Sequence, residues 1–281
     1  MPPVAGSPVD AVVLAGGPPD AALTGGPLPK AFAAIGPSTM VERVIAALRG
    51  APQIRRVAVV GPDPLPPAVA AAATLAVPAA GGLLENLSAG LAALDGGMPR
   101  DAVPVLVAAA DVPLLTAAAV TGFLEAAQAT GADAVYAVVP REEVDRAAPG
   151  VRKTFVRLAD GEFTGGSLVL LRPGAFARAR PVIERAVRAR KRPWELARLF
   201  GLGTLLGLAT GRLRIAALER RAETLAGLRA RAIICRDAGV ALDVDTPEML
   251  ALVRRRLASV HDPVPGHPVS RGAAGPAGEA S

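Results

Sequence analysis

Short apolar runs recur along the first two thirds of the chain, and each has the length of a β-strand. They are Val-rich stretches at residues 10–17, 56–61, 103–111, 133–139 and 165–174. Their hydrophobicity is continuous rather than alternating, which is typical of strands buried on both faces of a parallel sheet. The pattern predicts a central sheet with helices packed on both sides.

Helical patterns alternate with these strands. Thr39 and Glu42 have the spacing of a capping box at the start of one predicted helix. Residues 86–94 and 116–131 predict two more helices, the second with Thr116 as its N-cap. Alternating strands and helices over the first 140 residues predict an α/β fold with a mostly parallel, Rossmann-like sheet.

The second half of the chain has a different pattern. Residues 175–236 are predicted to be helical and form an insertion in a single domain that spans 8–260. A short strand and a helix are expected at 241–260, with Thr246 as the N-cap of that helix. Residues 262–281 are rich in Pro, Gly and Ser, and we expect a disordered tail there.

Composition narrows the class of protein. Of the 281 residues, 51% are hydrophobic but only 3% are aromatic, so the core must be built from Ala, Val and Leu. No apolar stretch reaches the roughly 18–20 residues that a membrane-spanning helix needs. The N-terminus has no basic segment or cleavage site of a secretory signal, and a single cysteine excludes an intramolecular disulfide framework. We therefore expect a cytoplasmic protein.

The positive charge is concentrated in one part of the chain. Residues 176–236 contain 15 Lys and Arg against 4 Asp and Glu, whereas the whole chain has a net charge of +6. A general nucleic-acid binder would more often be basic throughout or carry aromatic platforms, so we expect no nucleic-acid partner. Three interpretations of 175–236 stay open: peripheral contact with an anionic membrane, a helical cover that binds an acidic acceptor, or a helical subdomain with solvated arginines.

A glycine-rich loop follows the first predicted strand. Gly16 and Gly17 allow backbone N–H groups to point into one concavity, which suits phosphate oxygens. Lys30, after a further Pro/Gly-rich stretch, is suited to place a positive charge on a phosphate. The alternatives are a simple tight turn and a solvated lysine.

Carboxylates occur at two further places where ligands bind in open α/β sheets. Asp111 ends a strand that is otherwise apolar, and Asp243 and Asp245 directly precede the last predicted helix. Each has a structural alternative, since Asp is common in turns and at helix N-caps. Together they are the oxygen ligands that Mg²⁺ prefers, with water and substrate phosphate completing the shell.

The stretches "VLAGG…K", "ADVPLL", "GG-S-L" and "DVDTPE", in this order, resemble the MobA-like nucleotidyltransferases. The resemblance covers roughly residues 10–172 and 240–258. It implies a Rossmann-like sheet and an enzyme that moves an NMP from an NTP onto a phosphate-bearing small-molecule acceptor, with release of pyrophosphate.

The resemblance also implies roles for individual residues. Asp111 and Lys30 are expected to be catalytic. Asp111, Asp245 and Asp243 are expected to hold Mg²⁺. The expected nucleotide-binding residues are Leu14, Ala15, Gly16, Gly17, Lys30, Gly81, Gly82 and Ser88. The expected acceptor-binding residues are Lys153, Gly165 and Gly166.

The chain departs from the family in its phosphate loop. The family usually has an Arg soon after the glycines, but no Arg lies between Gly17 and Lys30. Two alternative functions therefore stay open: a nucleotide-sugar glycosyltransferase of related fold, and a non-catalytic protein that binds nucleotides or phospholipids. The sequence does not indicate the base of the NTP, the acceptor or the oligomeric state.

Overall fold

The computed structural model describes residues 6–95, 103–189 and 201–261. Its centre is an eight-stranded sheet. The strands are β1 (Val9–Leu14), β4 (Ile54–Gly61), β5 (Leu75–Pro78), β6 (Val105–Ala109), β7 (Ala134–Pro140), β8 (Val156–Leu158), β9 (Gly161–Leu171) and β10 (Ala230–Ile234). A separate two-stranded sheet contains β2 (Ala34–Ile35) and β3 (Ser38–Thr39).

The order of the strands is β10-β7-β9-β6-β1-β4-β5, and β8 pairs with β9. The pairs β1–β4, β1–β6, β4–β5 and β7–β10 are parallel. β9 lies antiparallel between β6 and β7, so the sheet is mostly rather than wholly parallel. The chain builds outward from β1 through β4 to β5 and then places β6 on the other side of β1. The strand order therefore reverses between β1 and β6.

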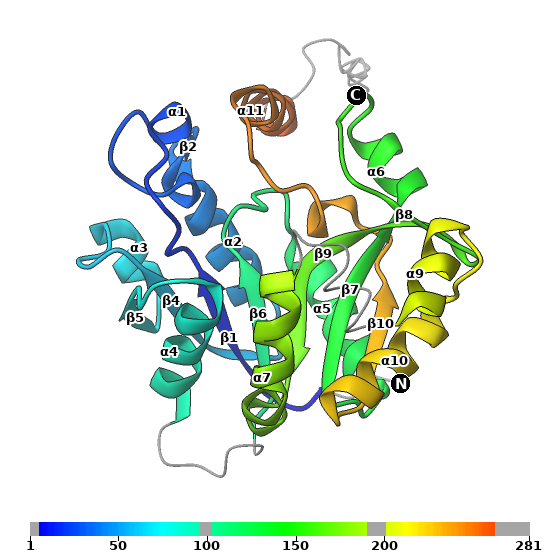
Figure 1. Ribbon diagram of the computed structural model, residues 1–281. Coiled ribbons are helices and arrows are strands. Elements are labelled where there is room, and N and C mark those ends of the chain that lie inside the picture. The colour runs from blue at the N-terminus through cyan, green and yellow to red at the C-terminus, as the bar shows by residue number, and fades with distance from the viewer. Residues whose placement is uncertain (1–5, 96–102, 190–200, 262–281) are drawn as a thin grey trace, which may run out of the picture.

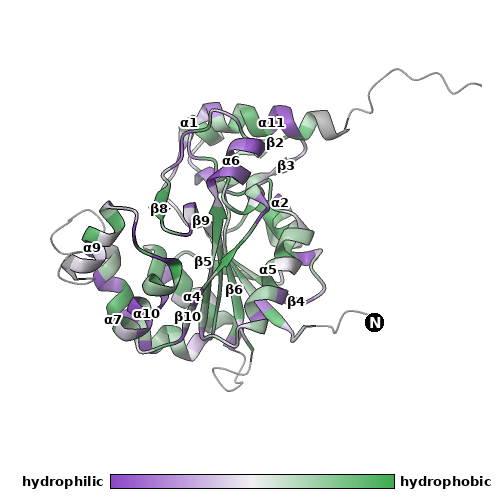
Figure 2. Ribbon diagram, turned by 90° about the vertical axis from the view of Figure 1, so that its right-hand side faces the viewer, coloured by the Kyte–Doolittle hydropathy of each residue, from purple (hydrophilic) through white to green (hydrophobic). Residues whose placement is uncertain are grey.

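Helices cover both faces of the sheet, as Figures 1 and 2 show. One face carries α4 (Leu83–Asp95), α7 (Pro173–Ala189) and α10 (Ile215–Ala226), with α9 (Leu202–Ala209) outside them, and the other carries α2 (Met40–Arg49) and α5 (Ala117–Ala129). Three helices gather beyond one end of the sheet: α1 (Ala21–Thr24), α6 (Arg141–Ala147) and α11 (Pro247–His261). The remaining elements are α3 (Pro67–Ala72) and the 3₁₀ turns η1 (Lys30–Phe32) and η2 (Ala238–Val240).

Burial on both faces explains the unbroken hydrophobicity of the strands. Consecutive side chains of a strand point to opposite faces of the sheet. In β1, Ala11 and Val13 belong to the apolar cluster that includes α2 and α5, whereas Val12 belongs to the cluster that includes Leu84 and Leu87 of α4. Because both clusters exclude water, the central positions Ala11, Val12 and Val13 have to be apolar. The predicted fold class is confirmed.

The predicted helix starts are also confirmed. Thr39 and Glu42 form the reciprocal capping box of α2. Thr116 caps α5 by accepting a hydrogen bond from Ala119 N. Thr246 accepts from Met249 N at 3.2 Å at the start of α11.

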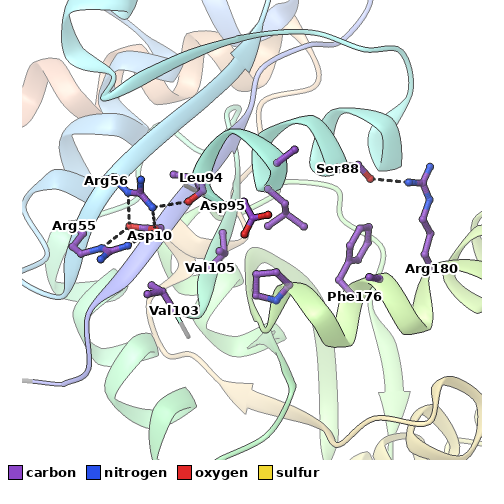
Figure 3. A pocket seen from close by; sticks show the side chains of 14 residues that line it. Asp10, Arg55, Arg56, Ser88, Leu94, Asp95, Val103, Val105, Phe176 and Arg180 are labelled. Carbon is purple, nitrogen blue, oxygen red and sulfur yellow. Dashed lines mark hydrogen bonds and ion pairs between the residues drawn. The ribbon is translucent and has the colours of Figure 1, made fainter. Parts of the chain in front are cut away.

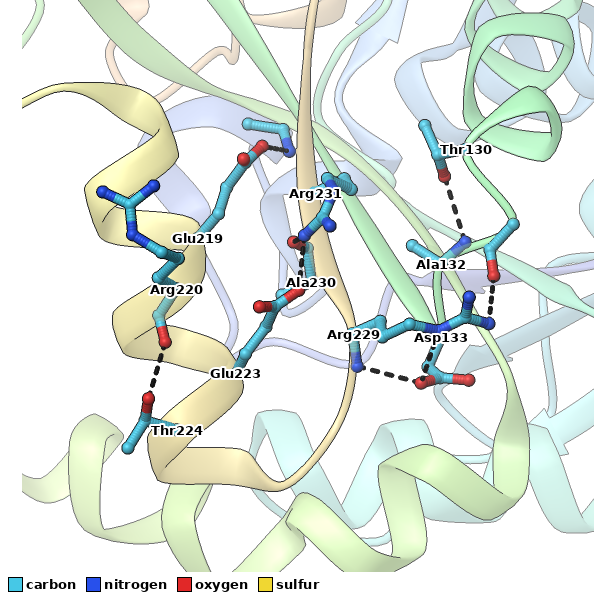
Figure 4. A network of polar contacts seen from close by, with 12 residues as sticks. Thr130, Ala132, Asp133, Glu219, Arg220, Glu223, Thr224, Arg229, Ala230 and Arg231 are labelled. Carbon is cyan, nitrogen blue, oxygen red and sulfur yellow. Dashed lines mark hydrogen bonds and ion pairs between the residues drawn. The ribbon is translucent and has the colours of Figure 1, made fainter.

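Two predictions of secondary structure are wrong. Residues 230–234, expected to be helical, form the edge strand β10, because their backbone pairs with β7 in parallel register. The Glu219 carboxylate of α10 accepts a hydrogen bond from Ala232 N at 2.8 Å (Figure 4). This contact satisfies a backbone donor of the edge strand. The short strand expected near residue 241 is instead η2 followed by residues without regular secondary structure.

The predicted tail at 262–281 and residues 190–200 of the predicted insertion lie outside the described residues. Within the insertion, the structure has α7, α9, α10 and β10. Its contact with an anionic membrane stays a prediction. Across the described ranges, no helix has both the length and the apolar character to traverse a lipid bilayer.

A buried ion-pair cluster stabilises the end of the sheet away from α11. Asp10, at the start of β1, is 2% exposed and accepts from the guanidinium groups of both Arg55 and Arg56 (Figure 3). Arg56 also donates to Leu94 O at 2.7 Å, which ties the end of α4 to the sheet. Burial alone would raise the pKa of Asp10, but hydrogen bonds and charge from the two arginines outweigh it and hold the pKa below its usual value.

Candidate functional site

The carboxyl ends of β1 and β6 bring together two features that lie far apart in the sequence. Leu14, the last residue of β1, is paired with Ala109, the last residue of β6. The Gly16–Gly17 loop follows the first strand and Asp111 follows the second. Since the strand order reverses here, this is the place where open α/β sheets bind their ligands.

The long loop after Gly17 folds back on itself and delivers Lys30 to the same edge. Asp20 N donates to Leu28 O at 2.9 Å, and Pro19 and Pro29 form an isolated β-bridge. The Thr24 hydroxyl lies inside this loop, within hydrogen-bond distance of three of its carbonyl oxygens. The stretch between the glycines and the lysine is therefore an ordered hairpin that fixes where Lys30 begins η1.

Lys30 lies between the two predicted metal-binding carboxylates. Its Nζ is 2.6 Å from Asp111 Oδ2 and also donates to Asp245 Oδ1. Burial lowers the pKa of Lys30, but the charge of Asp111 and the hydrogen bonds to both carboxylates outweigh it and raise the pKa above its usual value. Because both carboxylates reach one ammonium group, they are close enough to share a single cation.

Asp111 has an oxygen that nothing in the described part of the chain satisfies. Its Oδ1 is buried and has no hydrogen-bond partner, although its Oδ2 contacts Lys30. A buried polar atom left unpaired is costly and calls for a ligand. The backbone of Asp111 is fixed, since its carbonyl accepts from Val244 N at 2.9 Å. A divalent cation fits this donor set, because it can use the orphaned oxygen and a second carboxylate and take its other ligands from water and phosphate.

Asp243 and Lys153 form a second ion pair beside the first. Lys153 Nζ donates to Asp243 Oδ1 and to Ala241 O, and its side chain is only 14% exposed. Burial raises the pKa of Asp243. In the described ranges, no group of three or more His, Cys, Asp or Glu side chains is arranged to hold a metal ion. The structure therefore brings Asp111 and Asp245 together and turns Asp243 toward Lys153.

Two cavities meet at Asp111. The smaller, about 450 Å³, is lined by the predicted nucleotide residues Leu14, Ala15, Gly17 and Lys30 and by an apolar wall of Leu83, Leu84, Leu87, Phe176 and Ile183. The larger, about 1070 Å³, is lined by the predicted acceptor residues Lys153 and Gly165, by Asp243 and Asp245, and by Arg152 and Arg255. Both include Asp111 and Ser167 in their walls. The arrangement offers adjoining spaces for two substrates with a carboxylate at the junction.

Gly16 packs closely against Asn86, a residue that the sequence analysis did not identify. A Cβ at this position would lie 2.7 Å from Ala79 Cβ and 2.9 Å from Asn86 Nδ2. Asn86 is 3% exposed, donates to Gly16 O at 2.9 Å and accepts from Ala80 N at 2.7 Å. Asn86 therefore links the Gly16–Gly17 loop to the residues just before α4. The feature of the sequence that could have pointed to Asn86 is that it is a single amide side chain in the otherwise apolar pattern of a predicted helix.

The other residues predicted to read the nucleotide lie at the start of α4. Gly81, with φ 131°, and Gly82 immediately precede the helix, whose first residues Leu83 and Leu84 line the smaller cavity. Ser88 lies in the wall of a different cavity, where its hydroxyl accepts from Arg180 at 3.0 Å (Figure 3). Ser88 is therefore not among the described residues that line the smaller cavity, because its position on α4 turns it toward Arg180.

Gly165 and Gly166 lie where the pairing of β9 with β7 shifts register. A Cβ on Gly165 would meet Tyr136 Oη at 2.1 Å, and one on Gly166 would meet Ala137 Cβ at 2.9 Å. The two glycines permit this irregular stretch to pack closely against β7. Gly165 borders the larger cavity and Gly166 the smaller one.

Comparisons with known proteins bear on the family of this chain. Residues 11–229 match the MobA-like NTP transferase domain. A solved structure described as a hypothetical transferase from Thermus thermophilus is 40% identical, with a TM-score of 0.77, and the match covers 86% of this chain and 99% of that one. The crystal structure of a 4-diphosphocytidyl-2C-methyl-D-erythritol synthase is 19% identical, with a TM-score of 0.53 and coverage of 89% and 99%, and it shares the fold. No curated protein matches. The chain belongs to the MobA-like NTP transferase family and is a nucleotidyltransferase.

Proposed function

We propose that the protein transfers an NMP from an NTP onto a phosphate-bearing acceptor and releases pyrophosphate, with Mg²⁺ held by Asp111 and Asp245. The observation that carries this proposal is the orphaned Oδ1 of Asp111 beside a cation position that both carboxylates share. Mg²⁺ is commonly bound by one or two carboxylates together with substrate phosphates. The donor set at this edge of the sheet has that composition.

The two cavities offer a separate binding space for each of the two substrates. In the smaller one, the loop at Gly17 and the ammonium of Lys30 would hold the phosphates, and the apolar wall led by Leu83 would contact the base. In the larger one, the exposed guanidinium groups of Arg152 and Arg255 would bind the anionic acceptor. Lys153 is engaged with Asp243, so its contribution there is to position that carboxylate.

The chemistry needs positioning and charge neutralisation more than a protein base. An oxygen of the acceptor phosphate, already ionised near neutral pH, attacks the α-phosphorus of the NTP. The new P–O bond forms as the bond between the α-phosphorus and the bridging oxygen breaks, and pyrophosphate leaves with that electron pair. When bound, Mg²⁺ would neutralise charge on the phosphate oxygens. Lys30 would release the carboxylates and bind phosphate oxygens instead.

The missing loop Arg makes this enzyme depend strongly on Lys30. Of the described residues that line the smaller cavity, Lys30 alone carries a positive charge. The hairpin between Gly17 and Lys30 instead carries Asp20, which caps the short helix α1. We therefore propose that Lys30 and the divalent cation together replace the charge that family members obtain from an arginine.

A substrate screen tests the proposal. The protein would be incubated with each of the four NTPs, Mg²⁺ and a panel of phosphorylated acceptors, and pyrophosphate would be measured. We expect release that requires both substrates and the cation. Glycosyl transfer from a nucleotide sugar without pyrophosphate would indicate the glycosyltransferase alternative. Nucleotide binding without turnover on any acceptor would indicate the non-catalytic one.

A further inference from the structure

Another cavity is lined by Leu114, Leu115 and Thr116, which belong to the loop that follows Asp111. Its volume is about 720 Å³. Its walls come from α2, the loop 112–116, α6, the segment around η2, and α11. It has no lining residue in common with the two cavities that meet at Asp111. It is therefore a separate space, although α11 and the segment after η2 contribute different residues to it and to the larger cavity.

The walls of this cavity carry an excess of positive charge. Arg43, Arg146, Arg236 and Arg256 each come from a different segment of the chain, and the carboxylates among the lining residues are Glu143 and Asp237. Both carboxylates are already engaged. Asp237 accepts from Gly239 N at 2.7 Å and from the Thr116 hydroxyl at 3.2 Å, and Glu143 pairs with Arg146.

Arg43 is the most buried charge of the four. It is half-buried, and its Nε donates to the neutral carbonyl of Pro113 at 3.0 Å. Burial lowers its pKa, and no carboxylate within the described ranges compensates its charge. The start of α5 adds positive potential, because this 13-residue helix begins after Thr116 in the cavity wall and has no acidic residue in its first turn.

We propose that this cavity binds a small anion of the phosphate class that carries two or more negative charges. Converging guanidinium groups bind such anions through charge-assisted, often bidentate, hydrogen bonds. An anion here would relieve the repulsion among the arginines and accept hydrogen bonds from guanidinium groups in the cavity wall. The occupant would lie against the same loop whose first residues follow Asp111, and Arg43 holds that loop through Pro113 O.

The test is a calorimetric titration with inorganic pyrophosphate in the absence of divalent cations. Arg146 and Arg236 are exposed, but Arg146 pairs with the largely buried Glu143, so urea unfolding of the variant that replaces both arginines checks that it folds like the parent. We expect the double variant Arg146→Gln/Arg236→Gln to bind pyrophosphate at least about ten-fold more weakly, since hydrogen bonds to charged groups are involved. The matched control Arg212→Gln/Arg220→Gln removes the same charge from exposed residues outside this cavity and should bind like the parent.

Lys30→Met separates this site from the candidate active site and should keep the binding. Three results would each overturn the proposal: a parent protein that does not bind pyrophosphate, an Arg146→Gln/Arg236→Gln variant that binds it equally well, and a Lys30→Met variant that loses the binding. None of these results depends on whether the protein transfers nucleotides.

Discussion

Lys30 occupies the position between two carboxylates that a divalent cation would need, so ammonium and cation should compete. Replacing Lys30 with Met keeps the length of the side chain and removes its charge. Asp111 and Asp245 would then face each other without a counter-ion. We expect Lys30→Met to bind Mn²⁺ more tightly than the parent when nucleotide is absent, and at the same time to lose nucleotidyl transfer.

The size of the effect follows from the geometry. Two unit charges about 4 Å apart near a protein surface interact by about 4 kcal/mol. The Asp245 side chain is 60% exposed, so solvent screens much of its share. We take about 1–2 kcal/mol as the difference in cation binding, which corresponds to about a ten-fold increase in affinity.

Electron paramagnetic resonance of free Mn²⁺ measures this affinity directly. Lys153→Met is the matched control, because it removes the same charge from a lysine that binds Asp243 and Ala241 O rather than the pair at Asp111. The control should change the affinity much less. Unchanged or weaker Mn²⁺ binding by Lys30→Met would refute the competition and with it the shared cation position.

Two further predictions concern stability. Asp10→Asn should lower the free energy of unfolding by about 2–3 kcal/mol, less than for a fully buried pair because Arg55 and Arg56 are about one third exposed. The pKa of Asp10 in the folded protein lies below the ordinary value of an aspartate, so this contribution is present at neutral pH and is lost as the pH falls through the folded-state pKa. Urea unfolding from pH 7 to 3 should therefore show a shrinking difference in unfolding free energy between variant and parent, and a constant difference would contradict the prediction. Gly16→Ala should lower the free energy of unfolding, measured with urea, by about 1–3 kcal/mol, because the added Cβ would meet Asn86. Gly17→Ala is the control and should leave it unchanged, because nothing lies within 4 Å of its Cβ. Equal losses for the two variants would show that the close packing of Gly16 against Asn86 does not matter.

Local signals in the sequence predicted much of the fold. The capping box of Thr39 and Glu42 and the N-caps Thr116 and Thr246 are decided within one helical turn, so they are readable without the rest of the structure. The edge strand β10 cannot be predicted from local signals in this way. Its five residues include Arg231 within an Arg-rich stretch, and its pairing with β7 depends on contacts almost 100 residues away.

The candidate site shows the same limit. The segment after η2 brings Asp245 to Asp111, since Val244 N donates to Asp111 O, and the sequence pattern was enough to name both carboxylates. The position of Lys30 between them depends on how a 12-residue hairpin folds back, and no pattern specified that. Asn86 was missed because its partners, Gly16 O and Ala80 N, belong to different loops. Ser88 was expected at the nucleotide, but the phase of α4 turns it toward Arg180.

The central claim is that Asp111 and a shared cation drive nucleotidyl transfer. The most direct measurement is the rate of pyrophosphate release by Asp111→Asn with Mg²⁺ and the substrate pair that the screen identifies, next to Asp145→Asn, which changes an exposed surface carboxylate. We predict a loss of about 10³-fold or more for Asp111→Asn, unchanged unfolding free energy, and parental activity for Asp145→Asn. A rate for Asp111→Asn equal to that of the parent would contradict the account.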